Sequence, residues 1–360
     1  MDSKKVLESE LEIKRLDKED MLRLILDLDG QCREAKSIGL DFNITSIDPK
    51  EVKNIVFTGL GGSAIGADLI RSFTAQDIEI PVSVNRNYTL PNFIDKNTLV
   101  IASSYSGNTE ETLSAFNIAK DKGARIIAIS SNGRLEQLAH DGNIPFIKVP
   151  KGYPPRCALA FSFIPVLIVL SRLGFIDAAE VHIEEVISIL GDLKKDLGPG
   201  VPIEKNISKR IALALYQRFP VIYGANDYID IAVTRLRGQL AENSKHLSSS
   251  HVFPEMNHNE IVGWDFPKEI IHSFVVIFLR DSGDHNRIAR RMDITRDILK
   301  EKGIDTIEIF SKGKGVLARM MSLVFTGDMI SFYLALLNGI DPTPVDRVTF
   351  LKNELAKESV

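Results

Sequence analysis

The amino-acid sequence predicts an α/β protein with two similar halves, each built from a parallel sheet that helices flank. Three observations lead to this prediction. Strand-like and helix-like runs alternate along most of the chain, and the second half repeats the order of motifs in the first. The 360 residues also exceed the length, about 250–300 residues, at which a single hydrophobic core stops growing.

Short apolar runs in the first half predict buried strands, because each is rich in β-branched residues and precedes a turn signal. They are Asn54–Thr58, a shorter run at 82–84, Thr98–Ser103, Arg125–Ser130 and 146–149. Helical segments are predicted between them at 64–73, 110–122 and 135–140. This alternation implies βαβ units, which align the strands in parallel and join them by right-handed crossovers.

The middle of the chain predicts a bridge between the halves. Residues 157–196 have helical character throughout, and the run 198–202, with two glycines and two prolines, is the best linker candidate. We therefore expect a first domain over 1–197, which includes N-terminal helices and the bridge. A second domain over 203–360 is expected to end in C-terminal helices.

The second half repeats three motifs of the first half in the same order, at offsets of 165, 176 and 180 residues. The pairs are Val56-Phe57-Thr58-Gly59 with Val221-Ile222-Tyr223-Gly224, Ile101…Ser106-Gly107-Asn108 with Ile277…Ser282-Gly283-Asp284, and Lys122-Gly123…Ile127-Ala128-Ile129 with Lys302-Gly303…Ile307-Glu308-Ile309. Ordered matches with a slowly drifting offset indicate a duplicated domain.

The two copies differ at the turn after the third strand. The first turn carries Ser104, Ser106 and Thr109 around Gly107, whereas the corresponding turn at 279–285 has lost most hydroxyls and gained acids. A helix that follows a strand directly leaves unpaired N–H groups at its electropositive start. The first turn therefore predicts a site for a monophosphate held by neutral donors. Helix capping is the alternative, but it explains only one or two of these side chains.

A second turn, Gly59-Leu60-Gly61-Gly62-Ser63-Ala64, also follows a strand and matches a dinucleotide-binding fingerprint. A dinucleotide site also needs an acid at the end of the second strand, which here ends in Asn85-Arg86. The glycines equally suit a tight turn that brings the N–H groups of Gly62 and Ser63 towards a sugar phosphate.

The composition argues against several other classes. A net charge of −4 and a pI near 6.0 give no sign of a nucleic-acid or anionic-membrane partner. Cys32 and Cys157 lie far apart, without metal or redox spacing, which fits a reducing compartment. The charged N-terminal segment does not have the pattern of a signal peptide, and the longest apolar run, 157–170, is short for a membrane span. We expect a cytoplasmic protein.

Five motifs together resemble one branch of the sugar isomerase (SIS) domain proteins. They are Gly59-Leu60-Gly61-Gly62-Ser63, the serine-rich turn 104–112, Gly152-Tyr153-Pro154-Pro155-Arg156, Glu242-Asn243-Ser244-Lys245 and Pro254-Glu255-Met256-Asn257-His258-Asn259-Glu260. The serine-rich turn alone would indicate only a SIS domain. The combination is similar to the bifunctional phosphoglucose/phosphomannose isomerases, from about residue 20 to the C-terminus.

This resemblance implies two SIS domains and a reversible conversion of glucose 6-phosphate or mannose 6-phosphate into fructose 6-phosphate, through a cis-enediol and with no metal or organic cofactor. It also implies a homodimer in which His258 of one subunit completes the site of its neighbour.

Each step of that reaction has a candidate residue. Glu242 would carry the proton between C1 and C2, and Arg156 would stabilise the enediolate. His258 would open the sugar ring, because its ordinary pKa lies near neutrality, with Lys352 as helper. The residues expected to hold the phosphate are Gly62, Ser63, Ser104, Ser106 and Thr109.

The residues alone leave other interpretations open. Glu242 could form a surface ion pair with Arg235 or Arg237, and Lys352 could be one of several solvated lysines. His258 lies between Glu255 and Glu260, a grouping that suggests a metal site but has no further ligand at sensible spacing.

Cys157 replaces the serine that relatives usually carry after Arg156, and we interpret it as a small buried residue, not a nucleophile. Two functions compete with the isomerase hypothesis: a non-catalytic sugar-phosphate sensor with SIS domains, and an isomerase of another sugar phosphate. The preference between glucose and mannose is left open, and Thr343 is a candidate for lining the space around C2.

Overall fold

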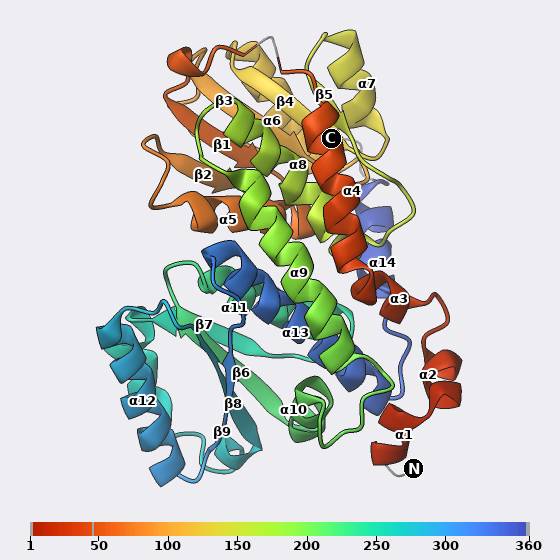
Figure 1. Cartoon of the computed structure of the whole chain (residues 1–360), viewed down its shortest axis with the longest axis vertical. Helices are drawn as coiled ribbons and strands as arrows, with labels where there is room; N and C mark the ends of the chain where they lie inside the picture. Colours follow the sequence, from red (N-terminus) through yellow and green to blue (C-terminus); the bar gives the residue numbers. More distant parts are fainter. Residues whose placement is uncertain (1–2, 45–46, 358–360) are drawn as a thin grey trace.

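The computed structural model describes residues 3–44 and 47–357. It contains two sheets, one above the other in Figure 1, with helices around and between them. The upper sheet belongs to the first half of the sequence and the lower sheet to the second half. This confirms the predicted α/β class with two parallel sheets.

Sheet A has the strand order β2-β1-β3-β4-β5, and every neighbouring pair is parallel. Its strands are β1 (Asn54–Thr58), β2 (Val82–Asn85), β3 (Thr98–Ser103), β4 (Arg125–Ser130) and β5 (Phe146–Lys148), and its crossover helices are α5 (Gly61–Thr74), α6 (Glu110–Asp121) and α7 (Arg134–Asp141). All five predicted strands are confirmed. Helix α5 begins three residues before the predicted start, because the glycine turn itself forms its first turn.

Sheet B has the order β7-β6-β8-β9 and is also parallel. Its strands are β6 (Phe219–Ala225), β7 (Ser249–Phe253), β8 (Phe274–Arg280) and β9 (Asp305–Phe310), with helices α11 (Asp230–Glu242) and α12 (Asn286–Glu301) between them. The strands that carry matching motifs occupy matching places: β6 corresponds to β1, β8 to β3 and β9 to β4. The structure therefore confirms the repeat at the level of topology.

The bridge is two helices, α8 (Leu159–Arg172) and α9 (Ala179–Leu197), so the prediction of continuous helix over 157–196 is wrong at 173–178. Gly174 has a φ of 82°, and the N–H of Phe175 donates to the carbonyl of Leu170. This pattern is a Schellman motif, in which a left-handed glycine ends the helix.

The remaining elements pack around the bridge or connect it to the sheets. The helices are α1 (Ser3–Glu8), α2 (Glu10–Leu16), α3 (Met21–Leu26), α4 (Leu28–Asp41), α10 (Ile207–Leu215), α13 (Val316–Leu337) and α14 (Asp346–Leu355). Short 3-10 turns are η1 (Pro49–Glu51), η2 (Pro155–Cys157), η3 (Glu255–His258), η4 (Glu260–Gly263) and η5 (Ile271–Ser273).

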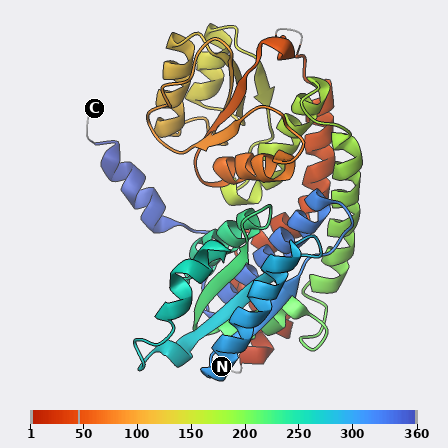
Figure 2. The same ribbon diagram turned by 90° about the vertical axis from the view of Figure 1, so that its left-hand side faces the viewer.

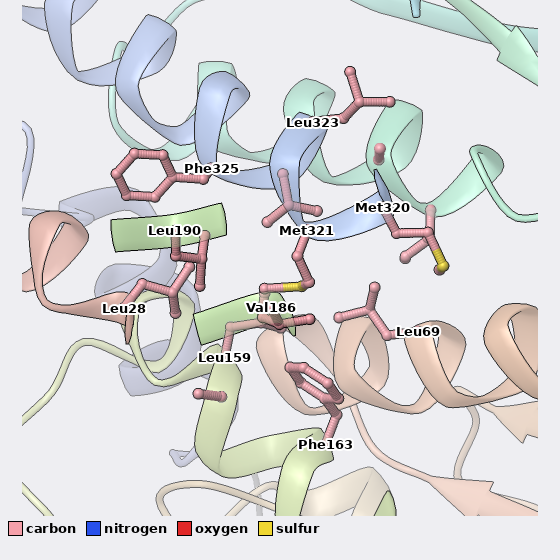
Figure 3. Close-up of a cluster of buried hydrophobic side chains, with 14 of the residues drawn as sticks. Leu28, Leu69, Leu159, Phe163, Val186, Leu190, Met320, Met321, Leu323 and Phe325 are labelled. Atoms are coloured by element: carbon pink, nitrogen blue, oxygen red, sulfur yellow. The ribbon is translucent and has the colours of Figure 1, made fainter. Parts of the chain in front are cut away.

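One hydrophobic core joins the two halves (Figure 3). Leu69 of α5 and Phe163 of α8 come from the first half, Val186 from α9, and Met321 from α13 of the second half. All are buried, so a rigid interior at the density of a protein core holds the two sheets in one orientation. That orientation sets the carboxyl edge of sheet A against the second half.

Helix α13 is long and apolar enough to cross a membrane by length and composition, but its apolar window is 100% buried inside the protein. It is the central helix of the second half. The expected cytoplasmic location stays a prediction, as do the domain boundaries.

Candidate active site

The serine-rich turn after β3 brings three hydroxyl groups together at the carboxyl edge of sheet A. The hydroxyl oxygens of Ser104 and Thr109 lie 2.8 Å apart, and the Ser63 hydroxyl accepts the Tyr105 N–H at 3.3 Å. Ser104 and Ser63 are buried, whereas Ser106 is exposed and its hydroxyl accepts the Asn108 N–H. The turn thus forms a rim of hydroxyls at the start of α6, as the phosphate prediction requires.

Two glycines make this turn possible. Gly107 has a φ of 70°, and a Cβ there would lie 1.7 Å from the carbonyl oxygen of Asn132. A Cβ on Gly62 would lie 2.6 Å from the carbonyl oxygen of Pro155. The start of α5 is therefore pressed against the loop that carries Arg156, and the two predicted parts of the site are in contact.

Arg156 is buried, with 4% of its surface exposed, and its guanidinium points towards the second half. Its Nη1 lies 3.6 Å from Oε2 of Glu242, whose side chain is 44% exposed. Its Nη2 donates to the carbonyl oxygens of Thr343 at 2.7 Å and Pro342 at 2.9 Å. The structure therefore unites Arg156 with Glu242, and the ion pair of Glu242 with Arg235 does not form, because Arg235 binds Asp328.

A buried hydrogen-bond relay, missed at the level of sequence, orients Arg156. The Ser331 hydroxyl donates to the carbonyl of Asp328 at 2.7 Å and accepts from the amide nitrogen of Asn243 at 3.0 Å. The amide oxygen of Asn243 must then face Arg156, and it accepts the Nε–H of Arg156 at 2.6 Å. Each group has one direction, so the relay defines the orientation of the guanidinium.

An ion pair holds the backbone of the same arginine. Arg235 donates to both carboxylate oxygens of Asp328, at 3.0 and 2.7 Å, and also to the carbonyl of Arg156 at 3.0 Å. Burial raises the pKa of Asp328, and the Arg235 charge opposes that shift. The only available signal was the run Arg235…Gln239…Asn243 at helical spacing, which also fits a solvated helix face.

We predict that Ser331→Ala lowers kcat by about 3- to 10-fold with little change in KM, since one neutral hydrogen bond that orients Asn243 is lost. Ser331→Thr should restore the rate, because it keeps the hydroxyl. Ser208→Ala is the matched control, a buried serine whose hydroxyl bonds the Thr326 carbonyl elsewhere on α13. An equal loss of kcat in both alanine variants would show that the effect is general loss of packing.

The structure does not bring His258 to Glu242 within one subunit. Strands β6 and β7 are parallel and α11 connects them, so Glu242 at the end of α11 lies at the amino edge of sheet B. His258 follows β7 and lies at the carboxyl edge, where its side chain is exposed. The two residues are thus at opposite edges of the sheet.

The loop around His258 is nevertheless well anchored. The Tyr223 hydroxyl donates to Glu260 at 2.5 Å, and the amide of Asn257 donates to the Thr295 hydroxyl at 3.1 Å. Glu260 therefore acts as an anchor for this loop. Within residues 3–44 and 47–357 no group of three or more His, Cys, Asp or Glu side chains is placed to hold a metal ion.

Thr343 and Lys352 differ in their relation to the site. Thr343 is buried, and its hydroxyl has no hydrogen-bond partner among the residues that the structure describes. Lys352 lies on α14, is exposed, and is not brought to Glu242. Lys245, to which the sequence assigned no role, donates to the carbonyls of Asp341 and Pro342, both at 3.0 Å. Burial lowers the pKa of Lys245, with a further contribution from the Arg156 charge.

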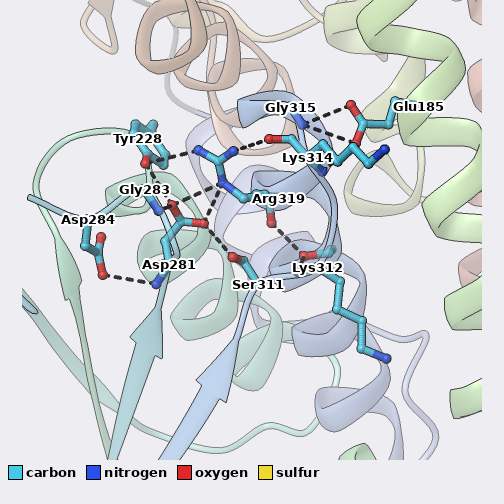
Figure 4. Close-up of polar contacts among 11 residues, drawn as sticks. Glu185, Tyr228, Asp281, Gly283, Asp284, Ser311, Lys312, Lys314, Gly315 and Arg319 are labelled. Atoms are coloured by element: carbon cyan, nitrogen blue, oxygen red, sulfur yellow. Dashed lines mark hydrogen bonds and ion pairs between the residues drawn. The ribbon is translucent and has the colours of Figure 1, made fainter.

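The corresponding turn of the second copy is filled by its own carboxylate (Figure 4). Asp281 accepts the Gly283 N–H at 2.7 Å, the Tyr228 hydroxyl at 2.8 Å and the Arg319 Nε–H at 3.0 Å. The side chain of Asp281 is fully buried. An anion that approached this turn would meet that charge, which agrees with the expectation that only the first turn could bind a phosphate.

Cys157 is buried and its sulfur lies 3.0 Å from that of Met21. Burial raises its pKa to about 12, so the thiol stays protonated at neutral pH. This agrees with the interpretation of a small buried residue. The strand-end test for a dinucleotide also holds, since Arg86 after β2 pairs with Asp68.

Two parallel sheets in duplicate, with a hydroxyl-lined turn in one copy, define a double-SIS protein. A SIS-domain model matches residues 50–147, and a model of the bacterial phospho-glucose isomerase C-terminal SIS domain matches residues 204–355. A solved glucose-6-phosphate isomerase like protein from Thermus thermophilus shares the fold, with a TM-score of 0.64 and 19% identity over 94% of this chain and 97% of that one.

Curated relatives define the family more narrowly. A bifunctional phosphoglucose/phosphomannose isomerase from Caldicellulosiruptor bescii is 46% identical over 94% of this chain and 99% of its own length. The enzyme of the same name from Aquifex aeolicus is 39% identical over 85% of this chain and 92% of its own length. The chain belongs to the family of bifunctional phosphoglucose/phosphomannose isomerases.

Proposed function

We propose that the chain interconverts glucose 6-phosphate or mannose 6-phosphate with fructose 6-phosphate. The observation that carries this proposal is the placement of Glu242 3.6 Å from Arg156, beside a turn of hydroxyls that suits a phosphate. A base, a fixed cation and an anion site are the three parts that an aldose–ketose isomerisation needs.

In the proposed mechanism the phosphate binds the N–H groups of Gly62 and Ser63 and the hydroxyls of the first turn, Ser104, Ser106 and Thr109. The Glu242 carboxylate takes the proton from C2 and returns it to C1, while the hydroxyl proton moves between the two oxygens. C1 is reduced and C2 is oxidised within one molecule, so no external oxidant takes part.

The enediolate between these two steps carries negative charge on oxygen. Arg156 is permanently charged, buried and held in one orientation by Asn243 and the carbonyls of the 342–343 segment. Such a preorganised cation stabilises developing charge at little reorganisation cost. The buried, unpartnered Thr343 hydroxyl supports a role for this residue beside C2, where the two aldose substrates differ.

Ring opening needs a proton acceptor and donor, and we assign these roles to His258 of a neighbouring subunit with Lys352 as helper. The position of His258 at the far edge of sheet B supports a homodimer with shared sites, since His258 cannot serve the Glu242 of its own subunit. Its exposed imidazole on an anchored loop suits contact with another chain.

A coupled assay with both aldose phosphates tests the proposal, with Ser104→Ala and Thr109→Val as probes of the phosphate turn. We expect wild type to turn over both substrates and each variant to raise KM by roughly 10- to 100-fold, because a hydrogen bond to a charged group is lost. Ser37→Ala is the control, an exposed serine on α4. EDTA should leave the rate unchanged. Normal KM values in both turn variants would contradict the phosphate site.

A further inference from the structure

The C-terminal helix α14 stands away from the rest of the molecule (Figure 2). None of its residues is buried. Val348, Leu351 and Leu355, at spacings of three and four residues, form an apolar stripe in which each is 45–58% exposed. A helix of 10 residues is marginal in water by itself, so this stripe needs a surface to cover it.

A matching apolar surface lies on the segment 260–271, just after His258. Val262 is 78% exposed, Phe266 71% and Ile270 48%. Phe266 also lines a groove of about 220 Å³ whose floor includes Trp264 and Phe274. Exposed large apolar side chains gathered beside a groove are typical of a docking surface.

The two surfaces are also complementary in charge. The stretch 254–271 contains four carboxylates and one lysine, and Lys302 neutralises only Asp265 among them. On α14 the acid Glu354 pairs with Lys357 at 2.6 Å, while Arg347 and Lys352 are exposed. Cations on the helix would therefore meet an excess of negative charge on the segment.

The place of the two surfaces in the fold points to a second copy of this chain as the occupant. The segment before α14 binds Arg156 through Thr343, beside Glu242. If His258 serves a neighbouring Glu242, as the proposed function holds, its own segment 260–271 arrives at the base of the neighbour's α14. We infer that α14 of each subunit docks on the 260–271 segment of the other, an arrangement that twofold symmetry forms twice.

Substitutions on both surfaces test this contact. Leu351→Ser and Phe266→Ser should each weaken the dimer roughly tenfold or more in sedimentation experiments, as expected for a central apolar side chain. Specific activity should fall on dilution and recover at high protein concentration. Val181→Ser, an exposed apolar position on α9, is the control and should leave the dimer intact. Dimers of wild-type strength in both variants would overturn the inference.

A cross-link gives an independent readout. A chain with Leu351→Cys and Phe266→Cys should form a covalent dimer on mild oxidation, whereas neither single variant should. The native Cys32 and Cys157 are buried and do not compete. A double variant that stays reducible to monomer-sized chains without any cross-linked species would also overturn the inference.

Mixing two inactive variants separates this inference from the proposed function. His258→Asn and Glu242→Gln chains, mixed and allowed to exchange, should recover about one quarter of wild-type activity if sites are shared, because half of the dimers are hybrids with one intact site. Recovery together with normal dimers of Leu351→Ser would overturn only the α14 contact. No recovery would overturn the shared site on which the inference rests.

Discussion

Glu242→Gln is expected to lose at least about 100-fold in turnover of both glucose 6-phosphate and mannose 6-phosphate, the scale of a group that transfers a proton in the transition state. Glutamine keeps the size of the side chain and can still approach Arg156, but it cannot accept the proton from C2. The measurement is kcat in the coupled assay, with stability followed by thermal unfolding.

Glu180→Gln is the matched control for this change, because Glu180 is an exposed partner of Lys36 on the bridge. It should keep wild-type turnover. If Glu242→Gln also turned over substrate at a near-normal rate, Glu242 would have no part in proton transfer and another base would be required.

Arg156→Lys is expected to lower kcat by roughly 100- to 1000-fold, the effect of removing a preorganised donor to a developing oxyanion. Lysine keeps the charge but cannot contact Asn243, Pro342, Thr343 and Glu242 together, since those contacts use three different nitrogens of one planar group. Steady-state kinetics on both substrates separates kcat from KM.

Arg172→Lys is the control for this second change. Arg172 also donates to several backbone carbonyls, those of Gly39, Leu40 and Phe42, but it lies at the end of α8, away from Glu242. Its conversion should cost some stability and leave kcat intact. A rise in KM alone in Arg156→Lys would mean that Arg156 binds the phosphate and does not stabilise the enediolate.

The strands of sheet A could be predicted from sequence almost to the residue, because each is a short β-branched run between turn signals. The break in the bridge could not, since residues 173–178 lie between two long apolar helices and only Gly174 indicates the end of the first. The duplication was also readable, because it rests on the order of local motifs that the topology preserves.

The candidate site was readable in part. The hydroxyl turn follows from its local pattern, whereas the choice of Arg156, Glu242 and His258 came from the resemblance. Nothing in the sequence indicated that Ser331 and Asn243 orient Arg156. Nor did it indicate that the acids of the second turn are turned inward, with Asp281 bonded to Arg319 from a distant helix.

The sequence by itself determined the α/β class, the repeat and the anion-binding turn, because these depend on residues that are near neighbours along the chain. Only the tertiary structure decided which side chains meet. Arg156 contacts Asn243 across 87 positions and Thr343 across 187, and Glu242 and His258, only 16 positions apart, lie at opposite edges of one sheet. Distance along the chain does not predict distance in space once the chain has crossed a sheet, and the shared core between the halves sets which edges face each other.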